Sequence, residues 1–253
     1  MYPFSASTLL EIWERGLGKS PVEQALVILA AAFPQAAPGA LESFTIEQRD
    51  TTLFHLRERA FGPQLKGLAD CPACGERLEL SFTADDLRAK GLLPSPSLSL
   101  PDTNPAITRL RVKGYEVEFR LPNSVDLLSS VSLVDDELTQ RHLLESCIVS
   151  ARYRKNALSV GELPDKVILA VVEQMGQAAV LANLTIASTC PDCGHQWNIV
   201  FDIVSYFWSE INAWAMRMMR EIHLLASAYG WSEADILAMS AWRRQRYLEL
   251  IGG

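Results

Sequence analysis

The chain has 253 residues, enough for one large domain or two ordinary ones, and its 49% hydrophobic and 21% charged residues are typical of a globular protein. Its formal net charge of −7 argues against a free-standing nucleic-acid binder, because such proteins usually carry a basic surplus. The N-terminus lacks a basic leader, and prolines interrupt the longest uncharged run, residues 24–41, before it could span a bilayer. We therefore expect a soluble protein that is made in the cytoplasm and has no membrane span.

Helix signals dominate the first 62 residues. Thr8 and Glu11 have the spacing of a capping box, which predicts the start of a first helix. Residues 20–23 combine a serine that can cap, a proline at the first helical position and a glutamate that can reach back to the serine amide. Residues 45–48 repeat the capping-box spacing at the start of a third helix. An N-terminal helical region is therefore predicted over residues 1–69.

The central part of the chain mixes strand and helix signals. Apolar residues alternate over residues 107–121 around Lys113-Gly114, which predicts a β-hairpin. Residues 93–105 contain four of the thirteen prolines and are predicted to form a loop. Helices are expected at about residues 125–134, 136–151 and 164–181. Residues 89–185 are therefore predicted to form an α/β lobe.

Four of the five cysteines form two copies of one motif. Cys71-Pro72-Ala73-Cys74-Gly75 and Cys190-Pro191-Asp192-Cys193-Gly194 share the pattern Cys-Pro-x-Cys-Gly, and a phenylalanine follows each first cysteine after eleven residues, Phe82 and Phe201. In a zinc knuckle of this kind the proline presets the backbone and the glycine permits a positive φ, so that two thiolates point at one metal ion. Two such knuckles supply the four sulfurs of a tetrahedral zinc site. The sequence therefore predicts one structural zinc ion bound by Cys71, Cys74, Cys190 and Cys193.

The two knuckles lie far apart in the sequence, with 115 residues between Cys74 and Cys190. We expect a split zinc ribbon from residues 70–88 and 186–204, with a strand after each knuckle and the lobe inserted between them. Three other interpretations stay open. One is a redox-active Cys-x-x-Cys motif, and another is two zinc sites completed by histidine, with His195 near one knuckle. The third is a catalytic zinc ion, which would need an open coordination position. The fifth cysteine, Cys147, is expected on an apolar helix face in the core.

The C-terminal segment, residues 205–253, is rich in aromatic residues and methionine. Residues 205–251 contain four of the six tryptophans and four of the six methionines. A long helix is predicted over residues 204–229, followed by two shorter helices that Ser232 and Ser240 can cap. Such residues fill cores, and they also anchor protein interfaces. We predict a docking segment whose partner surface consists of Trp214, Tyr229, Trp231, Trp242, Arg243, Arg246 and Tyr247.

Motifs spread over nearly the whole chain resemble one known family. They are Pro3-Phe4 with Leu10, Trp13, Glu14, Arg15 and Gly16; Arg49-Asp50, Leu56-Arg57-Glu58 and Phe61-Gly62; Phe119-Arg120-Leu121-Pro122 before Asp126-Leu127; Glu221-Ile222-His223; Tyr229-Gly230-Trp231-Ser232-Glu233; and Arg246-Tyr247-Leu248-Glu249. With the two knuckles, this combination resembles phage-tail-type proteins of contractile tails and related injection systems, and is similar to the T-even phage baseplate protein family. The resemblance implies a structural baseplate role in a phage tail-like particle, with hub, tube or wedge subunits of the tail as partners.

Two further functions remain open from the residues alone. One is an assembly chaperone or adaptor that is absent from the mature particle. The other is a zinc-ribbon regulator that binds nucleic acid, which the basic cluster of Arg243, Arg244 and Arg246 would favour. The sequence has no nucleophile motif and no glycine-rich phosphate loop, so we expect no enzyme activity and no small-molecule substrate. The expected fold class is α+β, mainly α-helical, with the split zinc ribbon and the inserted lobe.

Overall fold

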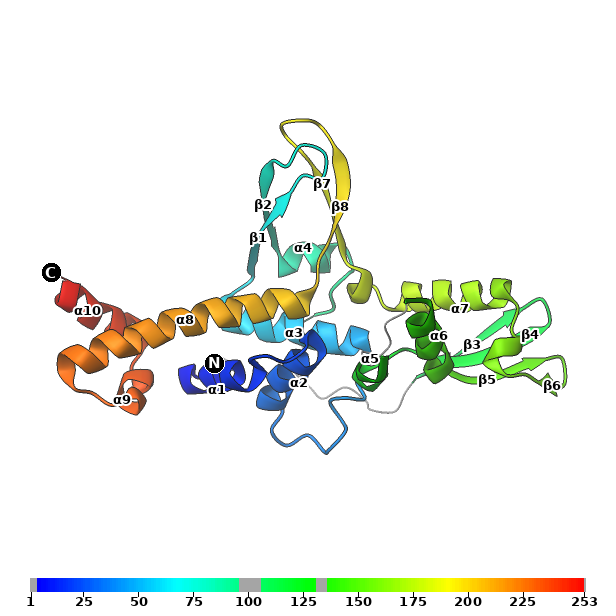
Figure 1. Ribbon diagram of the computed structural model, residues 1–253, viewed down its shortest axis with the longest axis horizontal. Coiled ribbons are helices and arrows are strands. Elements are labelled where there is room, and N and C mark those ends of the chain that lie inside the picture. Colours follow the sequence, from blue (N-terminus) through cyan, green and yellow to red (C-terminus); the bar gives the residue numbers. More distant parts are fainter. Residues whose placement is uncertain (1–3, 96–105, 131–135, 253) are drawn as a thin grey trace. The chain divides into compact units, whose positions relative to one another are not determined.

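A computed structural model describes residues 4–95, 106–130 and 136–252 of the chain (Figure 1). The fold is α+β and mainly helical, as the sequence predicts. The chain divides into two compact units: unit 1 comprises Met1–Pro34 and Ile203–Gly253, and unit 2 comprises Gln35–Asp202. None of the described helices combines the length and the apolarity needed to span a bilayer. The finer division into helical region, split ribbon, lobe and docking segment stays a prediction.

The described part of unit 1 is helical and contains α1 (Ala6–Gly16), α2 (Pro21–Ala32), α8 (Ile203–Tyr229), α9 (Glu233–Ala238) and α10 (Ala241–Gly252). The serines predicted to cap α2, α9 and α10 are Ser20, Ser232 and Ser240, and each accepts a hydrogen bond from the backbone amide three residues later. The predicted start of α1 is wrong, because Ser5 caps this helix and accepts from the Thr8 amide at 3.1 Å. A start one turn earlier uses an equally suitable cap and adds backbone hydrogen bonds.

The core of unit 1 lies between α8 and the helices that pack around it. One buried cluster consists of Leu10, Ala215, Met218, Ile222, Leu225 and Ile236. Helix α1 approaches α8 closely at a glycine, since a Cβ added at Gly16 would lie 2.3 Å from the ring of Trp208. The indole N–H of Trp13 donates to Asn212 Oδ1 at 2.8 Å. Close packing and a hydrogen bond therefore join α1 to α8.

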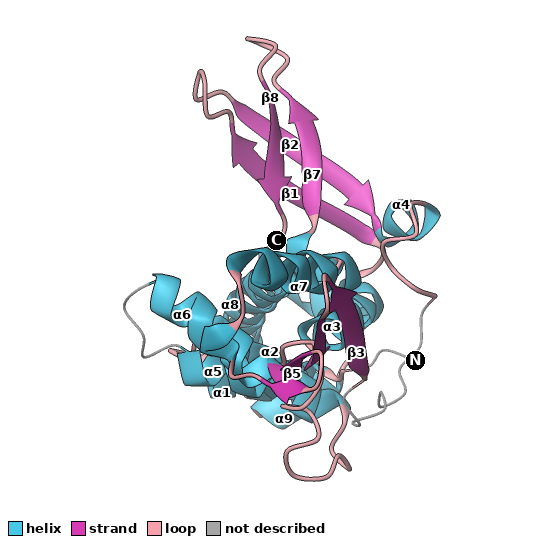
Figure 2. Cartoon of the chain, turned by 90° about the vertical axis from the view of Figure 1, so that its right-hand side faces the viewer, coloured by secondary structure: helices cyan, strands magenta, loops and turns pink. Residues whose placement is uncertain are grey.

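Unit 2 contains helix α3 (Ile46–Phe61) and two antiparallel β-hairpins. The first hairpin pairs β1 (Gln64–Asp70) with β2 (Arg77–Thr83), and the second pairs β7 (Thr185–Thr189) with β8 (Gln196–Val200). Figures 1 and 2 show the hairpins extending side by side, with their turns at the same end. Strands β2 and β8 match the strands predicted after the two cysteine motifs, whereas β1 and β7 have no counterpart in the sequence-based expectation.

The rest of unit 2 is built around a four-stranded antiparallel sheet in the order β3-β4-β5-β6. Its strands are β3 (Ile107–Val112), β4 (Tyr115–Arg120), β5 (Ile148–Tyr153) and β6 (Asn156–Ala157). The helices are α4 (Ala84–Ala89), α5 (Ser124–Ser130), α6 (Asp136–Cys147) and α7 (Asp165–Ala178), with short 3-10 helices η1 (Val160–Glu162) and η2 (Leu181–Asn183). The hairpin predicted around Lys113-Gly114 is confirmed. One face of the sheet and α7 form a core that includes Val117, Phe119, Val167 and Val171.

Residues 136–151 do not form one helix as predicted. Helix α6 ends at Cys147, and Ile148 begins strand β5, which pairs with β4. The β-branched residues at the start of β5 favour a strand, and the pairing satisfies backbone groups that a helix would leave open along β4. Cys147 is buried, as expected for a core residue. The loop predicted at residues 93–105 and the helix end predicted at residues 131–134 fall mostly outside the described residues.

Candidate metal centre

Each of the two hairpins turns through a Cys-Pro-x-Cys-Gly segment. Between β1 and β2 the amide of Cys71 donates to the Glu76 carbonyl at 2.8 Å, and between β7 and β8 the amide of Cys190 donates to the His195 carbonyl at 2.9 Å. The glycine amide of each motif also donates to the carbonyl of the first cysteine, at 2.8 and 3.0 Å. These glycines have φ of +78° and +72°, a conformation that other residues rarely adopt. The two turns are therefore copies of one backbone geometry.

The two turns bring four thiols together. The sulfurs of Cys71 and Cys193 lie 3.7 Å apart, those of Cys74 and Cys190 lie 3.6 Å apart, and all four lie within 4.8 Å of one another. Four sulfurs at ~2.3 Å from one tetrahedral zinc ion stand about 3.8 Å apart. The spacing therefore fits one metal ion. Within the described ranges this is the one group of three or more histidine, cysteine or acidic side chains that could hold a metal.

This convergence argues against two separate sites completed by histidine. The ring of His195 stacks on Trp197, with centroids 5.9 Å apart, rather than joining the thiols. Cys71 and Cys190 are buried, whereas Cys74 and Cys193 are exposed, so a cation can reach the cluster from solvent. Four thiolates fill a tetrahedral shell, suit zinc and leave no position for water or a substrate. The arrangement can therefore hold a structural ion.

Backbone amides near the thiols favour their ionised forms. Burial opposes the ionisation of Cys71, but hydrogen bonds from the amides of Cys74 and Ala73 lower the pKa of Cys71 to about 7. The amide of Glu76 likewise favours the Cys74 thiolate, but hydrogen bonds with the neighbouring thiols raise the pKa of Cys74 to about 12. The thiols thus share protons that a bound cation would displace. The same amides are available as donors to metal-bound sulfur.

An aromatic contact joins the two hairpins away from the thiols. The rings of Phe82 and Phe201 meet edge to face with centroids 5.2 Å apart, and Phe201 stacks on Phe54 of α3 at 5.8 Å. These are the two phenylalanines that follow the first cysteine of each motif by eleven residues. Arg57 of α3 donates to the Gln64 carbonyl at 2.6 Å, where β1 begins. The hairpins are therefore attached to α3 as well as to each other.

The aromatic residues of the C-terminal segment are divided between a packed cluster and the surface. The rings of Tyr229 and Trp231 stack with centroids 4.4 Å apart, and Tyr247 meets Trp231 edge-on at 4.7 Å. Trp214, Trp231 and Tyr247 also pack against the buried cluster of unit 1. Three of the residues predicted to bind a partner thus contribute to the fold of their own unit.

Of the other four predicted partner residues, Tyr229 ends α8, and Trp242, Arg243 and Arg246 lie exposed on α10. Trp242 is 69% exposed, and the guanidinium of Arg246 lies 5.3 Å from its ring centroid. Arg244 is buried instead and donates to Glu221 at 3.1 Å. The basic cluster seen in the sequence therefore contains two exposed residues and one structural residue. Sequence reasoning did not separate them, because all three carry the same charge within four positions.

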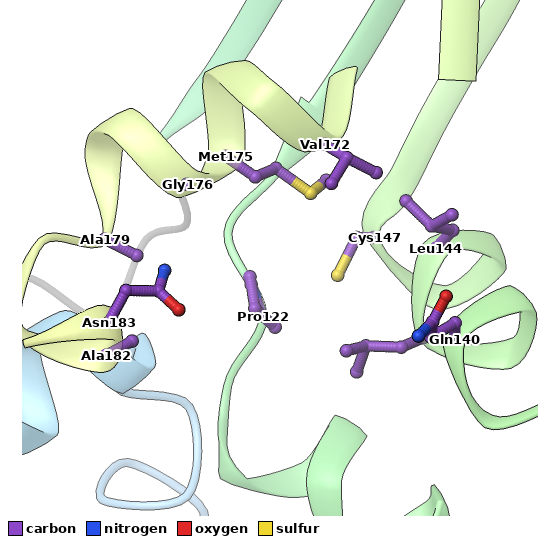
Figure 3. Close-up of a pocket in the computed structure, with 11 residues that line it drawn as sticks. Pro122, Gln140, Leu144, Cys147, Val172, Met175, Gly176, Ala179, Ala182 and Asn183 are labelled. Carbon is purple, nitrogen blue, oxygen red and sulfur yellow. The ribbon is translucent and has the colours of Figure 1, made fainter. Parts of the chain in front are cut away.

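Unit 2 also holds a cavity of about 410 Å³ that no motif predicts. Figure 3 shows Pro122, Cys147 and Met175 among its lining residues, together with Asn183 of η2. The lining is mostly apolar. Burial, with the nearby Asp126 charge, raises the pKa of Cys147 to about 11, so this thiol is neutral at pH 7. No sequence signal could have revealed the cavity, since its residues come from separate segments of the chain.

Comparisons with known proteins gave one match. A family model described as T4 bacteriophage base plate protein matches residues 21–208, well over half of the chain. Searches of curated proteins and of solved structures gave no match. The matched range contains the four clustered thiols and both hairpins that carry them.

Proposed function

We propose that this chain, which belongs to the T4 bacteriophage base plate protein family, is a non-enzymatic structural component of a contractile, phage tail-like baseplate. The observation that carries this proposal is the family match over residues 21–208. The chain is made in the cytoplasm and is then incorporated into the particle. Its partners there are other baseplate or tail proteins.

One zinc ion, held by the thiolates of Cys71, Cys74, Cys190 and Cys193, stabilises this component. The support is that all four sulfurs lie within 4.8 Å of one another, and that backbone amides near Cys71 and Cys74 favour the thiolate forms. The ion supplies no catalysis, because four cysteines occupy its coordination shell. It cross-links two hairpins that are far apart in the sequence, so its binding energy contributes to folding.

The C-terminal segment, residues 205–253, docks a partner subunit. Trp242, Arg243 and Arg246 are the residues best suited to direct contact, because they are exposed and because Trp and Arg often dominate binding energy at interfaces. Tyr229 is 37% exposed and lies at the margin of the packed aromatic cluster. Trp214, Trp231 and Tyr247 instead pack against the buried cluster of unit 1, and the guanidinium of Arg243 lies 5.7 Å from the ring centroid of Tyr247.

Quantitative mass spectrometry of purified tail-like particles tests the structural role. A structural subunit is expected at a fixed, low copy number in every preparation. If the chain is needed for building but is missing from mature particles, the structural role is wrong and an assembly chaperone or adaptor replaces it.

The docking segment is tested by comparing Trp242→Ala with Trp231→Ala. Trp242→Ala is expected to change the free energy of unfolding by less than ~0.5 kcal/mol, because the side chain is exposed, but to reduce the yield of assembled particles. Trp231→Ala should destabilise the fold itself, because its ring packs against Tyr229 and Tyr247. Thermal melting and electron microscopy of particles measure the two effects. Normal assembly with Trp242→Ala would mean that the docking surface lies elsewhere.

A further inference from the structure

The β3–β6 sheet has one apolar face and one charged face. The apolar face packs on α7, and the other carries two rows of cross-strand charges: Arg111, Glu116 and Arg152 in one row, and Arg109 and Glu118 in the next. Glu116 accepts from Arg111 at 3.0 Å and lies 3.3 Å from both Arg109 and Arg152. Arginines outnumber glutamates in this network, so the charged face keeps a positive charge after pairing.

Three more basic residues, Lys113, Arg154 and Lys155, form the turns at one end of this sheet. The Arg154 amide donates to the Gly114 carbonyl at 3.0 Å, so the β3–β4 and β5–β6 turns lie together (Figure 1). The three side chains are exposed, and none forms an ion pair with a described residue. Apart from Arg120, which pairs with Asp126, the strands and turns contain six basic residues and two glutamates, a net charge of +4 in a chain whose net charge is −7.

The backbone of these turns does not favour the basic residues that occupy them. Lys113 and Arg154 have φ of +49° and +56°. Residues other than glycine, asparagine and aspartate adopt this left-handed conformation at a cost, and tight hairpin turns prefer asparagine or glycine there. A chain with asparagine at both positions would therefore be expected to fold with equal or greater stability. A strained backbone that carries exposed charge points to a role for that charge.

Beside these turns lies a hollow of about 320 Å³. Its lining residues include Arg111, Lys113 and Arg154, and Glu116 is the one acidic residue among them. Three cations against one anion leave the hollow positively charged. Arginine can bind a carboxylate through two parallel hydrogen bonds, so the hollow suits an anionic side chain of another molecule.

We propose that the basic surface formed by Arg111, Lys113, Arg152, Arg154 and Lys155 docks an acidic segment of another baseplate protein. That the partner belongs to the baseplate rests on the proposed function, whereas its acidic chemistry follows from charge complementarity. The two glutamates on the sheet disfavour a nucleic acid, whose phosphates bring one negative charge about every 3.4 Å of strand. A protein segment can place carboxylates over the turns and neutral groups over the glutamates.

The double substitution Lys113→Asn with Arg154→Asn tests this surface on the isolated chain. It removes two charges and gives both turns a residue that tolerates positive φ, so we expect an unchanged or higher melting temperature. Binding is measured by fluorescence anisotropy with a labelled decapeptide of glutamate at low ionic strength. The double variant is expected to bind about tenfold more weakly than the unsubstituted chain, since exposed ion pairs each contribute up to ~1 kcal/mol. Raising the salt concentration to ~0.15 M should weaken peptide binding by both the unsubstituted chain and the double variant.

The matched control is Lys90→Asn with Lys166→Asn, which removes the same charge from two exposed positions elsewhere in unit 2. This control is expected to bind the peptide as the unsubstituted chain does. The proposal would be overturned if both double substitutions weakened peptide binding equally, or if Lys113→Asn with Arg154→Asn did not weaken it. Tighter binding of a duplex DNA oligomer at the same surface would also overturn it and would assign the surface to nucleic acid.

Carbodiimide cross-linking in purified particles tests the partner itself. This reagent joins a lysine amine directly to a carboxylate with loss of water, so Lys113 or Lys155 should be linked to an acidic residue of another subunit. Linkage of these lysines to acidic residues of the same chain alone would overturn the docking proposal. The peptide measurements do not depend on particles, so a chain missing from particles would refute the proposed function separately from the basic surface.

Discussion

Four of the charged residues that carry the family resemblance form two ion pairs within unit 2. Arg49 donates to Asp50 at 2.7 Å, and both side chains are buried. Arg120 makes two hydrogen bonds to Asp126, at 2.6 and 2.8 Å, beside the junction of α6 and β5. Burying a charge is costly unless it is paired, so these residues stabilise one particular arrangement of the chain. These residues therefore contribute to function by stabilising the fold.

At this residue scale, Asp126→Asn is expected to destabilise unit 2 strongly. The substitution keeps the size of the side chain but leaves the guanidinium of Arg120 without its counter-charge. Because 20% of the Arg120 side chain is exposed, we expect a loss of about 2 kcal/mol, below the ~3–5 kcal/mol for breaking a fully buried pair. Urea unfolding at pH 7 measures the loss. The control is Glu145→Gln, which breaks the exposed ion pair with Arg141 and should cost less than ~0.5 kcal/mol. Similar losses in the two variants would contradict the structural role of the buried pair.

The same pair predicts how the stability depends on pH. Burial alone would raise the pKa of Asp126, but hydrogen bonds from Arg120 and from the Asn123 amide outweigh it, so the pKa is lowered. A carboxylate with a lowered pKa in the folded state stabilises the protein fully above its unfolded pKa of about 4, and loses this contribution as the pH falls through the folded value. The difference in stability between Asp126→Asn and the unsubstituted chain should therefore shrink below pH ~4. A difference that stays constant on acidification would contradict this.

At the scale of elements, two helical glycines have opposite environments. Gly16 ends α1 where the ring of Trp208 on α8 leaves no room for a Cβ, whereas nothing lies within 4 Å of a Cβ added at Gly176 in α7. Alanine is the better helix former at both positions by about 1 kcal/mol. The packing around each glycine therefore decides whether alanine there raises or lowers the stability of the protein.

Gly16→Ala is expected to lower the melting temperature, and Gly176→Ala is expected to raise it. At Gly16 the 2.3 Å approach to the Trp208 ring forces α1 or α8 to shift, and overpacking typically costs 1–3 kcal/mol. At Gly176 the reduced freedom of the unfolded chain stabilises the protein by about 0.5–1 kcal/mol. Calorimetry of both variants measures the change in melting temperature. Adding Trp208→Leu should recover part of the loss in Gly16→Ala, and no recovery would mean that the clash is not its cause.

On the scale of the whole molecule, the thiol cluster links parts of unit 2 that the sequence keeps apart. Between Cys74 and Cys190 lie 115 residues, including the β3–β6 sheet and helices α4–α7. A metal ion that joins the two hairpins closes this long segment into a loop and so restricts the unfolded chain. Its removal should affect unit 2 as a whole and not the hairpins alone.

One zinc ion per chain is therefore expected to copurify with the protein. Elemental analysis measures the metal, and two zinc ions, none, or iron would contradict the single four-cysteine site. Cys190→Ser should lose the ion and lower the melting temperature by about 10 °C, if closing so long a loop contributes about 4 kcal/mol. Cys147→Ser is the control, because this buried cysteine lies outside the thiol cluster and its replacement should leave the zinc content unchanged. A strong chelator should destabilise the unsubstituted chain but not Cys190→Ser.

Local signals in the sequence determined much of the secondary structure and the candidate site. The caps at Ser20 and Ser240 and the turn at Lys113-Gly114 were predictable, because each depends on hydrogen bonds and backbone angles within a few residues. The repeated Cys-Pro-x-Cys-Gly motif identified the four thiols for a related reason. Each motif specifies its own turn, and the preference of zinc for four ligands implies that the two turns meet.

Only the tertiary structure decided which equivalent-looking residues are buried and which are free to bind. Strands β1 and β7 have weak intrinsic signals and exist because β2 and β8 satisfy their backbone groups. Trp231 and Arg244 are packed whereas Trp242 and Arg243 are exposed, although these residues look alike in the sequence. The basic turns of the β3–β6 sheet likewise come together only through strand pairing. Burial and strand pairing depend on partners distant in the chain, so a pattern of neighbouring residues does not contain them.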